Sequence, residues 1–347
     1  MQSVDFGEYL ITVIDSMDKN MTFQRGLICC ILCLCTLSVY GQNVKTINID
    51  VGNARPTNVS EIAENVIPIV LDKSVTMING NLFLTNDFLF ITSSSSIVQY
   101  DRTGMFIRSI NCEGYITYNV TCDTIKRELY VPVGNVIKCY DYSGKLIKTY
   151  QLTESILHIL YFKEHLWVQT YNKQSDEKYT HSIQKINLST GEITPLNFSL
   201  DLISTGSARI IRYKDGLVVS YEYNNALYNI QQDRVIPVVK WNISPPSTEM
   251  RDLFIMNTNG FSGDYLYINY RRGDELYTYL GNMQTGKKYN INNLVDDVFN
   301  TNNDCVMYPT NQDGYFFFIK GKYDIKGNSI GNIPLKNGPV LFIVKTK

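Results

Sequence analysis

The stretch that decides the fold is Tyr100-Asp101-Arg102-Thr103-Gly104-Met105-Phe106-Ile107, which returns as Tyr140-Asp141-Tyr142-Ser143-Gly144-Lys145-Leu146-Ile147 with its glycine 40 residues later. In each copy the Asp side chain can bond to turn amides, and the glycine supplies the positive φ that a short hairpin commonly requires. A unit of this size cannot bury its own apolar faces and must stack on its neighbours. The repeat therefore predicts a solenoid or a closed ring of similar units.

Six short apolar runs mark one unit each, and their spacing along the chain is 37 to 51 residues. They are apolar at consecutive positions, so both faces of each strand must be covered, unlike the strands of a half-solvated sheet. Radially stacked sheets provide that cover at this repeat length. The runs are Phe88–Ile91, Leu129–Val131, Leu166–Val168, Leu217–Val219, Tyr265–Ile268 and Tyr315–Ile319. We predict an all-β fold, a six-bladed β-propeller of four-stranded antiparallel blades over residues 66–347.

The two ends of the repeat region predict how the ring closes. The first unit has one strand too many, Val66–Leu71, ahead of Ser74–Ile78. Pro68 suits an outermost strand, because a proline has no N–H to donate to a further neighbour. The last unit offers only three strands, at Cys305–Tyr308, Tyr315–Lys320 and Val340–Lys345. We therefore expect Val66–Leu71 to complete the last blade as its outermost strand.

Residues 21–41 have the features of a secretory signal peptide. Met21–Arg25 is a short basic segment, Gly26–Leu37 is apolar, and Val39–Gly41 offers the small or modest residues of a cleavage site. The apolar stretch is shorter than the roughly 20 residues that a membrane-spanning helix needs. We therefore expect an exported protein without a transmembrane span, and a membrane anchor is the weaker alternative.

The residues around this segment complete the predicted organisation. We expect residues 1–20 to be a non-native or disordered extension, the mature chain to begin at Gln42, and residues 42–65 to lead into the propeller. The expected location is the periplasm or the cell surface. A lipoprotein is the lesser alternative, because none of the cysteines in the apolar segment follows a small residue.

Four cysteines remain in the mature chain: Cys112, Cys122, Cys139 and Cys305. Export permits disulfides, and four cysteines allow three pairings. The four are scattered through the repeats without a C-x-x-C pair, which argues against a metal site. Buried free thiols are the favoured interpretation.

Composition and charge limit the kinds of partner. The chain has 347 residues, 44% of them hydrophobic, with 25 Tyr and 15 Phe, which is ample material for a strand-rich core. The formal net charge is -1, so a basic field of the kind that holds nucleic acid is not expected. We expect the protein to be a monomer and to have no nucleic-acid partner.

Signatures of catalysis are sparse. The only histidines are His158, His165 and His181, and they lack the His-Glu-x-x-His spacing of a zinc hydrolase. The sequence also has no Gly-x-Ser-x-Gly elbow and no glycine-rich phosphate loop. We expect no metal and no cofactor, and we assign no catalytic residue.

The lead-in strand, the Asn86–Ile91 strand and the Tyr100–Ile107 hairpin resemble the six-bladed β-propeller proteins that gut Bacteroidetes export. The resemblance extends over about residues 60–347, and only the first two blades carry it closely. It implies a bacterial envelope protein from a family without an established general activity. This chain departs from those relatives at residues 111–116, where many of them have a segment rich in glycine, so a role tied to that loop is in doubt.

Candidate binding residues come from the loops that join second to third strands and blade to blade, which share one face of a propeller. We call it the loop face. Arginine can grip a carboxylate or phosphate with two hydrogen bonds, and aromatic faces stack on sugars. The predicted ligand-binding residues are Arg271, Arg272, Tyr223, Glu222, Arg209 and Trp241.

These observations predict a non-catalytic binding or scaffold module for a polar ligand, either a glycan or a peptide, or for an envelope protein. The alternative is a periplasmic or surface lyase or hydrolase with its site at the mouth of the central channel. A purely structural subunit is a third possibility, and it predicts an apolar patch on the outer rim.

Overall fold

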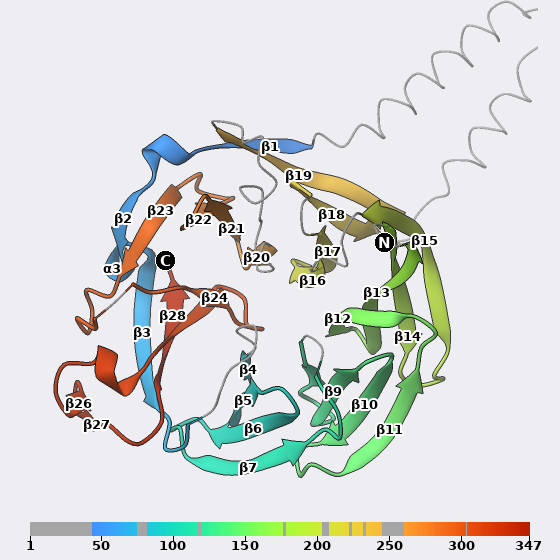
Figure 1. The fold of residues 1–347 in the computed structure, drawn as a ribbon, viewed down its shortest axis with the longest axis horizontal. Coiled ribbons are helices and arrows are strands. Elements are labelled where there is room, and N and C mark those ends of the chain that lie inside the picture. The colour runs from blue at the N-terminus through green and yellow to red at the C-terminus, as the bar shows by residue number, and fades with distance from the viewer. Residues whose placement is uncertain are drawn as a thin grey trace, which may run out of the picture. The chain divides into compact units, whose positions relative to one another are not determined.

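Six sheets stand side by side around a ring in the part of the chain from Thr46 to Lys347 (Figure 1). The computed structural model describes residues 44–74, 82–116, 119–175, 178–202, 208–221, 224–231, 234–244, 260–302 and 304–347. The predicted signal peptide and most of the predicted strand Ser74–Ile78 lie outside the described residues. The predicted β-propeller of six blades is confirmed.

Blades 1 to 3 are four-stranded and follow the chain from the innermost strand outward, each as an antiparallel meander. Blade 1 contains β4 (Leu82–Leu84), β5 (Phe88–Thr92), β6 (Ser96–Asp101) and β7 (Phe106–Asn111). Blade 2 contains β8 (Thr121–Asp123), β9 (Glu128–Val133), β10 (Val136–Asp141) and β11 (Leu146–Gln151). Blade 3 contains β12 (Ser155–Phe162), β13 (His165–Ser175), β14 (Lys178–Asn187) and β15 (Ile193–Leu202).

Blades 4 and 5 have the same meander, and blade 6 takes only three strands from the C-terminal part of the chain. Blade 4 contains β16 (Ala208–Tyr213), β17 (Gly216–Tyr221), β18 (Ala226–Gln231) and β19 (Arg234–Ser244). Blade 5 contains β20 (Gly260–Ser262), β21 (Tyr265–Arg272), β22 (Glu275–Asn282) and β23 (Lys288–Val295). Blade 6 contains β24 (Tyr308–Pro309), β25 (Tyr315–Lys320) and β28 (Val340–Thr346).

The N-terminal part of the described chain runs along the outer edges of three successive blades (Figure 1). First, β1 (Lys45–Asp50) adds a fifth strand to blade 4 outside β19. After the short 3-10 helix η1 (Val51–Asn53), β2 (Arg55–Asn58) pairs in parallel with β23 of blade 5. The helical turn α3 (Val59–Ile62) then leads into β3 (Ala63–Val70). The segment that the sequence suggested as a lead-in, residues 42–65, therefore contributes β1 and β2 to two blades and the first residues of β3 to a third.

Strand β3 closes the ring. It pairs antiparallel with β28 over seven residue pairs, from Val340 with Val70 to Thr346 with Ala63, and forms the outermost strand of blade 6. Pro68 lies opposite Phe342 in this edge strand. The predicted closure by the N-terminal strand is therefore confirmed.

The six apolar runs are the second strands of the six blades, and their burial explains why they are apolar at consecutive positions. In β9, Leu129 and Val131 pack into the cluster between blades 1 and 2, whereas Tyr130 packs into the cluster between blades 2 and 3. Phe316 and Phe317 of β25 divide in the same way between the two neighbours of blade 6. Among the described residues, six apolar clusters occupy the six junctions between blades. Each blade is thus held by its neighbours.

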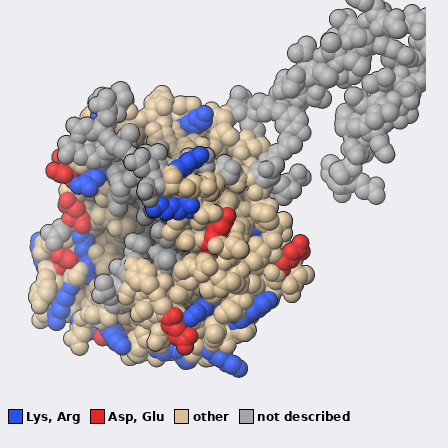
Figure 2. All heavy atoms as spheres, turned by 45° about the vertical axis from the view of Figure 1, so that its right-hand side comes forward, with Lys and Arg blue, Asp and Glu red and all other residues tan. Residues whose placement is uncertain are grey.

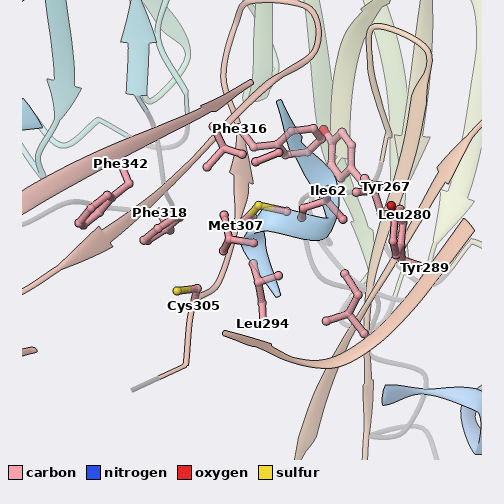
Figure 3. Packing of buried hydrophobic residues seen from close by; sticks show 14 of the residues in the cluster. Ile62, Tyr267, Leu280, Tyr289, Leu294, Cys305, Met307, Phe316, Phe318 and Phe342 are labelled. Atoms are coloured by element: carbon pink, nitrogen blue, oxygen red, sulfur yellow. The ribbon is translucent and has the colours of Figure 1, made fainter. Parts of the chain in front are cut away.

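Figure 3 shows the cluster between blades 5 and 6, where Ile62 of α3 lies beside Met307. Ile62 is completely buried, and its cluster also contains Leu280 of blade 5 and Phe342 of blade 6. The N-terminal segment therefore contributes to the interior of the ring as well as to its edge strands.

The two motif copies form the same turn. Asp101 Oδ1 accepts hydrogen bonds from the N–H and the hydroxyl of Thr103 and from the N–H of Met105. Asp141 makes the equivalent bonds in blade 2. Gly104 and Gly144 have φ values of 89° and 90°, as the turn chemistry predicted.

Blade 6 departs from the sequence prediction in two places. Its innermost strand β24 is only two residues long and begins at Tyr308 rather than at Cys305. Cys305 and Met307 are buried but precede the strand. The connection from β25 to β28 also carries an insertion with the 3-10 helix η3 (Lys322–Asp324) and the strands β26 (Ser329–Ile330) and β27 (Ile333–Pro334).

The four cysteines of the propeller are buried free thiols, the interpretation that the sequence favoured. Burial raises the pKa of each thiol, to about 12 for Cys112 and to about 11 for Cys305. They are therefore protonated packing residues at ordinary pH.

Candidate functional site

A cavity of about 180 Å³ occupies the central channel, and the innermost strands of all six blades line it. Its walls combine aromatic and aliphatic side chains with hydroxyl, amide and charged groups. Phe83 comes from blade 1, Tyr161 from blade 3 and Phe261 from blade 5. Convergence of side chains from every repeat on one cavity is the arrangement in which binding sites of such folds are expected.

Several polar groups of the channel hold the blades together. The side-chain amide of Asn119 accepts the N–H of Ile159 at 3.0 Å and donates to its carbonyl at 2.7 Å. Asn311 makes the same pair of bonds with Leu84, at 2.6 and 2.9 Å. Each amide thus takes the place of a neighbouring strand, joining blade 2 to blade 3 and blade 6 to blade 1.

Three more side chains bridge neighbouring blades at their inner edges. His158 Nδ1 accepts the N–H of Ile210 at 3.2 Å, which links blade 3 to blade 4. The hydroxyl of Thr121 accepts the N–H of Tyr161, and the hydroxyl of Ser262 accepts the N–H of Gly314. These polar residues are occupied by the fold and have less to offer a ligand.

Arg209 and Arg212, both on β16, are the two cationic residues among those that line the cavity. Side chains alternate along a strand, and the two residues between them show the directions. Ile210 packs into the cluster between blades 3 and 4, and Ile211 into the cluster between blades 4 and 5. Arg212 accordingly lies over the ring of Phe162 in blade 3, at 5.5 Å from its centre. The two guanidinium groups leave opposite faces of the strand.

The charge of Arg209 acts on two buried groups. Burial first, and then the positive charge of Arg209, lower the pKa of His158 well below its ordinary value. Burial raises the pKa of Tyr267, and the charge of Arg209 partly offsets this. His158 is therefore neutral at physiological pH. Among the described residues, neither Arg209 nor Arg212 has an acidic side chain within ion-pair distance.

A wider recess of about 690 Å³ adjoins the cavity at one mouth of the channel. It lies on the face that carries the connections from first to second and from third to fourth strands, which we call the turn face. The β4–β5 turn and the β8–β9 turn form part of its wall, including Asp87 and Arg127. Four residues line both the cavity and the recess: Thr124, Arg212, Asn311 and Asp313. The two spaces are therefore continuous.

The structure separates the six residues predicted to bind a ligand. Arg209 lines the central cavity. Arg271 is exposed at the β21–β22 turn, where its Nε donates to the carbonyl of Gly273 at 2.9 Å and its guanidinium lies 3.4 Å from Asp274. Arg272 is the last residue of β21, at the same turn. Glu222 and Tyr223 lie outside the described residues.

Trp241 is 1% exposed and belongs to the same buried cluster as Ile47 and Ile49 of β1. Its aromatic face therefore packs inside the fold. The sequence offered no indication of this, because β1 was not recognised as a strand that covers blade 4.

Sequence reasoning missed Arg212 and the inner-edge residues Asn119 and Asn311. The sequence contained a signal for Arg212. In Arg209-Ile210-Ile211-Arg212, two cations flank two apolar residues, the pattern of a short strand with an arginine at each end. The recess on the turn face was also missed, since tight turns were read only as connections. The loop-face prediction for the remaining residues stays a prediction.

Charges are mixed over the surface, and Figure 2 shows lysines, arginines and acidic residues interspersed on the described part of the face in view. Among the described residues, no group of three or more His, Cys, Asp or Glu side chains is arranged to hold a metal ion. Within the same residues, no helix has the length and apolar character to cross a membrane.

Comparison with known proteins identifies the fold. A protein of Bacteroides fragilis NCTC 9343, assigned to the exported proteins by its description, aligns with a TM-score of 0.64 and 13% sequence identity over 87% of this chain and 100% of its own. A protein of unknown function from Bacteroides thetaiotaomicron VPI-5482 aligns with a TM-score of 0.50 and 13% identity over 82% of this chain and 76% of its own. The chain has a six-bladed β-propeller fold. The suspected resemblance to exported Bacteroidetes propellers is thus confirmed at the level of the fold.

No family model matches the sequence, and no curated protein matches it either. The comparisons therefore support the architecture of the propeller and leave the ligand to be argued from the site itself.

Proposed function

We propose that this protein is an exported, non-catalytic binding module that holds a polar ligand in the central channel of its propeller. A glycan, a peptide or a segment of an envelope protein is the proposed class of ligand. The observation that carries the proposal is the pair of arginines, Arg209 and Arg212, among the residues that line a cavity to which all six blades contribute. Cations that have no acidic partner among the described residues, held on a rigid closed scaffold, are preorganised for a ligand.

The other polar groups that line the cavity support ligand binding over catalysis. His158 is neutral and its Nδ1 already accepts a backbone N–H. Asp313 is the one acidic residue that lines the described cavity, so a pair of carboxylates of the kind used by glycosidases does not face the channel there. The described donors, mainly guanidinium and hydroxyl groups, suit recognition.

Export rests on the sequence of residues 21–41 and on the description of the Bacteroides fragilis structure. We propose a location in the periplasm or on the cell surface and a mature chain that begins at Gln42. The loop-face arginines Arg271 and Arg272 are proposed as a second contact surface for a ligand that extends beyond the channel.

Binding to glycan and peptide arrays tests the proposal, with the full chain expressed so that the predicted leader is processed. Hits are confirmed by calorimetry with wild-type protein and with T124W, which places a large ring at the passage between the recess and the cavity. K326W is the matched control, because Lys326 is exposed on the blade 6 insertion and away from the channel.

The expected result is at least one ligand whose binding T124W weakens and K326W leaves unchanged. A protein that binds nothing on either array, while turning over an envelope glycan in a substrate screen, contradicts the proposal and favours the lyase or hydrolase alternative.

A further inference from the structure

We propose that the channel receives the end of an acidic glycan through the turn-face mouth, with Arg212 and Arg209 as the groups that bind the carboxylates of its uronic acid residues. This inference rests on the proposed binding function and specifies the ligand class and the direction of entry. Four kinds of observation carry it: the charge of the cavity, the hydrogen bonds already made, the shape of the space and the continuity of the recess.

The cavity carries a net positive charge. Its lining contains two arginines and one acidic residue, Asp313, and His158 adds no charge. Guanidinium groups bind carboxylates with two parallel hydrogen bonds, and such charge-assisted bonds are among the strongest in proteins. An anionic group is therefore the best match for the two cations.

The hydrogen bonds at the inner edges favour a sugar over a peptide. An extended peptide is usually recognised through free main-chain groups of a strand edge. At three junctions these groups are already bonded: those of Leu84 by Asn311, those of Ile159 by Asn119, and the N–H of Ile210 by His158. A ligand in the channel must rely on side chains, as a sugar ring can.

The walls and size of the space also suit a sugar. The half-buried aromatic residues Phe83 and Tyr161 and the exposed Thr124 are among the residues that line the cavity. A pyranose has apolar C–H faces and a rim of hydroxyl groups, so it can use both. The cavity of about 180 Å³ is smaller than most ligand pockets, which span roughly 300 to 1,000 Å³, and takes only the end of a larger ligand.

The turn-face mouth is the described entrance. The recess of about 690 Å³ can hold the residues of a glycan that follow the inserted one. At its rim, Arg127 is already paired with Asp87 at 3.6 Å, whereas Arg212 lines both spaces without an acidic partner among the described residues. Arg209 lies three residues along β16, about 10 Å from Arg212 between Cα atoms at the usual rise of a strand. Arg212 is thus the first cation without an acidic partner among the described residues that an entering ligand meets, and Arg209 is the deeper one.

Asp313 provides a second test, in which a substitution should strengthen the binding of the ligand instead of weakening it. It is exposed and lines both the cavity and the recess. A carboxylate at this position repels an anionic ligand, although it accepts hydrogen bonds from sugar hydroxyl groups more strongly than an amide does. Replacing it by Asn should therefore strengthen the binding of a uronate relative to the binding of the matching neutral sugar.

The experiment measures the affinity of the full chain by calorimetry for four-residue oligomers of glucuronate and galacturonate and for the matching neutral oligomers of glucose and galactose. Peptides with a free or an amidated C-terminus form a third arm. The variants are R212Q, R209Q, R212K and D313N, and R108Q is the control because Arg108 is exposed on the outermost strand β7. Thermal melts establish that each variant is folded.

We expect a uronate oligomer to bind and R212Q to weaken it by roughly 10- to 100-fold, as expected for the loss of a hydrogen bond between charged groups. R212K should retain part of the affinity, D313N should raise it by about 2- to 5-fold at low salt, and R108Q should change nothing. Raising the salt concentration should weaken binding of the wild type more than that of R212Q.

Three results overturn the inference. Binding of neutral oligomers or of free peptide carboxylates without binding of any uronate leaves the proposed function standing and rejects the ligand class. Uronate binding that R212Q and R209Q do not change places the ligand elsewhere. If no glycan or peptide binds in any arm, the proposed function fails together with the inference.

Discussion

Three N-terminal strands extend three neighbouring blades, yet they do different work. Strands β1 and β2 add a fifth strand to blades 4 and 5, which are complete without them. Strand β3 supplies the fourth strand of blade 6, which the C-terminal part of the chain leaves with three. All three strands lie at outer edges, so edge position alone does not show how much the fold depends on a strand. What differs is that the ring is closed without β1 and β2 but not without β3.

The buried side chains show the same difference. Ile69 and Val70 at the end of β3 and Leu71 directly after it have exposed fractions of 5%, 1% and 0%, and they divide between the clusters on both sides of blade 6. In β1 only Ile47 and Ile49 are buried, both in a single cluster. The end of β3 thus packs into the clusters on both sides of blade 6, whereas β1 packs into one cluster only.

The largest expected effect is that of deleting residues 60–72, which removes β3. Burial of the side chains of Ile69, Val70 and Leu71, all within the deleted segment, contributes roughly 5 to 9 kcal/mol. Because whole domains are stable by only about 5 to 15 kcal/mol, the variant should lose its cooperative thermal transition. Circular dichroism during heating measures this.

Deletion of residues 44–58 is the matched comparison, because it removes β1 and β2 and retains β3. Loss of Ile47 and Ile49 should cost roughly 3 to 6 kcal/mol, and the protein should still unfold cooperatively at a lower temperature. Equal melting curves for the two deletions would show that closure by β3 has no special weight.

A smaller effect is expected from the glycines of the two motif copies, which differ in their distance from the closing strand. Both have a positive φ, so alanine at either position should cost about 1 to 2 kcal/mol of backbone strain. A Cβ on Gly104 would in addition lie 2.4 Å from the carbonyl oxygen of Val70 in β3. A Cβ on Gly144 meets nothing closer than the Ile110 side chain at 3.2 Å.

Urea unfolding of G104A and G144A therefore sharpens the comparison. We expect G104A to lose more than about 3 kcal/mol of unfolding free energy, because Val70 must move and the β3–β28 pairing with it. G144A should lose about 1 to 2 kcal/mol. Similar losses in the two variants would contradict the expectation that crowding of Val70 in β3 adds to the cost of G104A.

The same contrast explains what the sequence could predict of the fold. The six second strands are buried on both faces, and their continuous apolar runs could be read directly. Strand β1 alternates and is buried on one face only, so Lys45–Asp50 looked like part of a polar lead-in. Strand β24 has only two residues, too few for any pattern. Closure could be predicted because the last unit of the sequence has only three strands, whereas the first unit has one strand too many.

The candidate site was harder to predict, because it depends on which inner strands meet. Arg209 was recognised by its residue type, but Arg212 and Asn311 gain their roles only when blades separated by many residues adjoin. Leu84 and Asn311, for example, are 227 residues apart in sequence and share two hydrogen bonds. Trp241 shows the converse case, since an aromatic residue suited to a ligand packs inside the fold under a strand that the sequence did not reveal.

The smallest expected effect concerns the inner edge of the ring, where His158 joins blades 3 and 4 far from the closing strand. Its folded pKa is lowered by burial and by Arg209, so below about pH 6.5 the unfolded chain binds a proton that the folded one does not. The contribution of His158 to stability is therefore fully present above about pH 6.5 and is lost as the pH falls toward the lowered folded pKa. The loss approaches about 1.4 kcal/mol per pH unit.

The variant H158N removes the titration and keeps an acceptor for the N–H of Ile210, because the Asn Oδ1 can occupy the position of Nδ1. Urea unfolding between pH 7.5 and pH 5 should show a steeper loss of stability in the wild type, by about 2 kcal/mol at pH 5. All other titrating groups are common to both proteins, so the difference isolates one proton. Parallel pH profiles would mean that His158 is solvated and that burial and Arg209 do not lower its pKa in the folded protein.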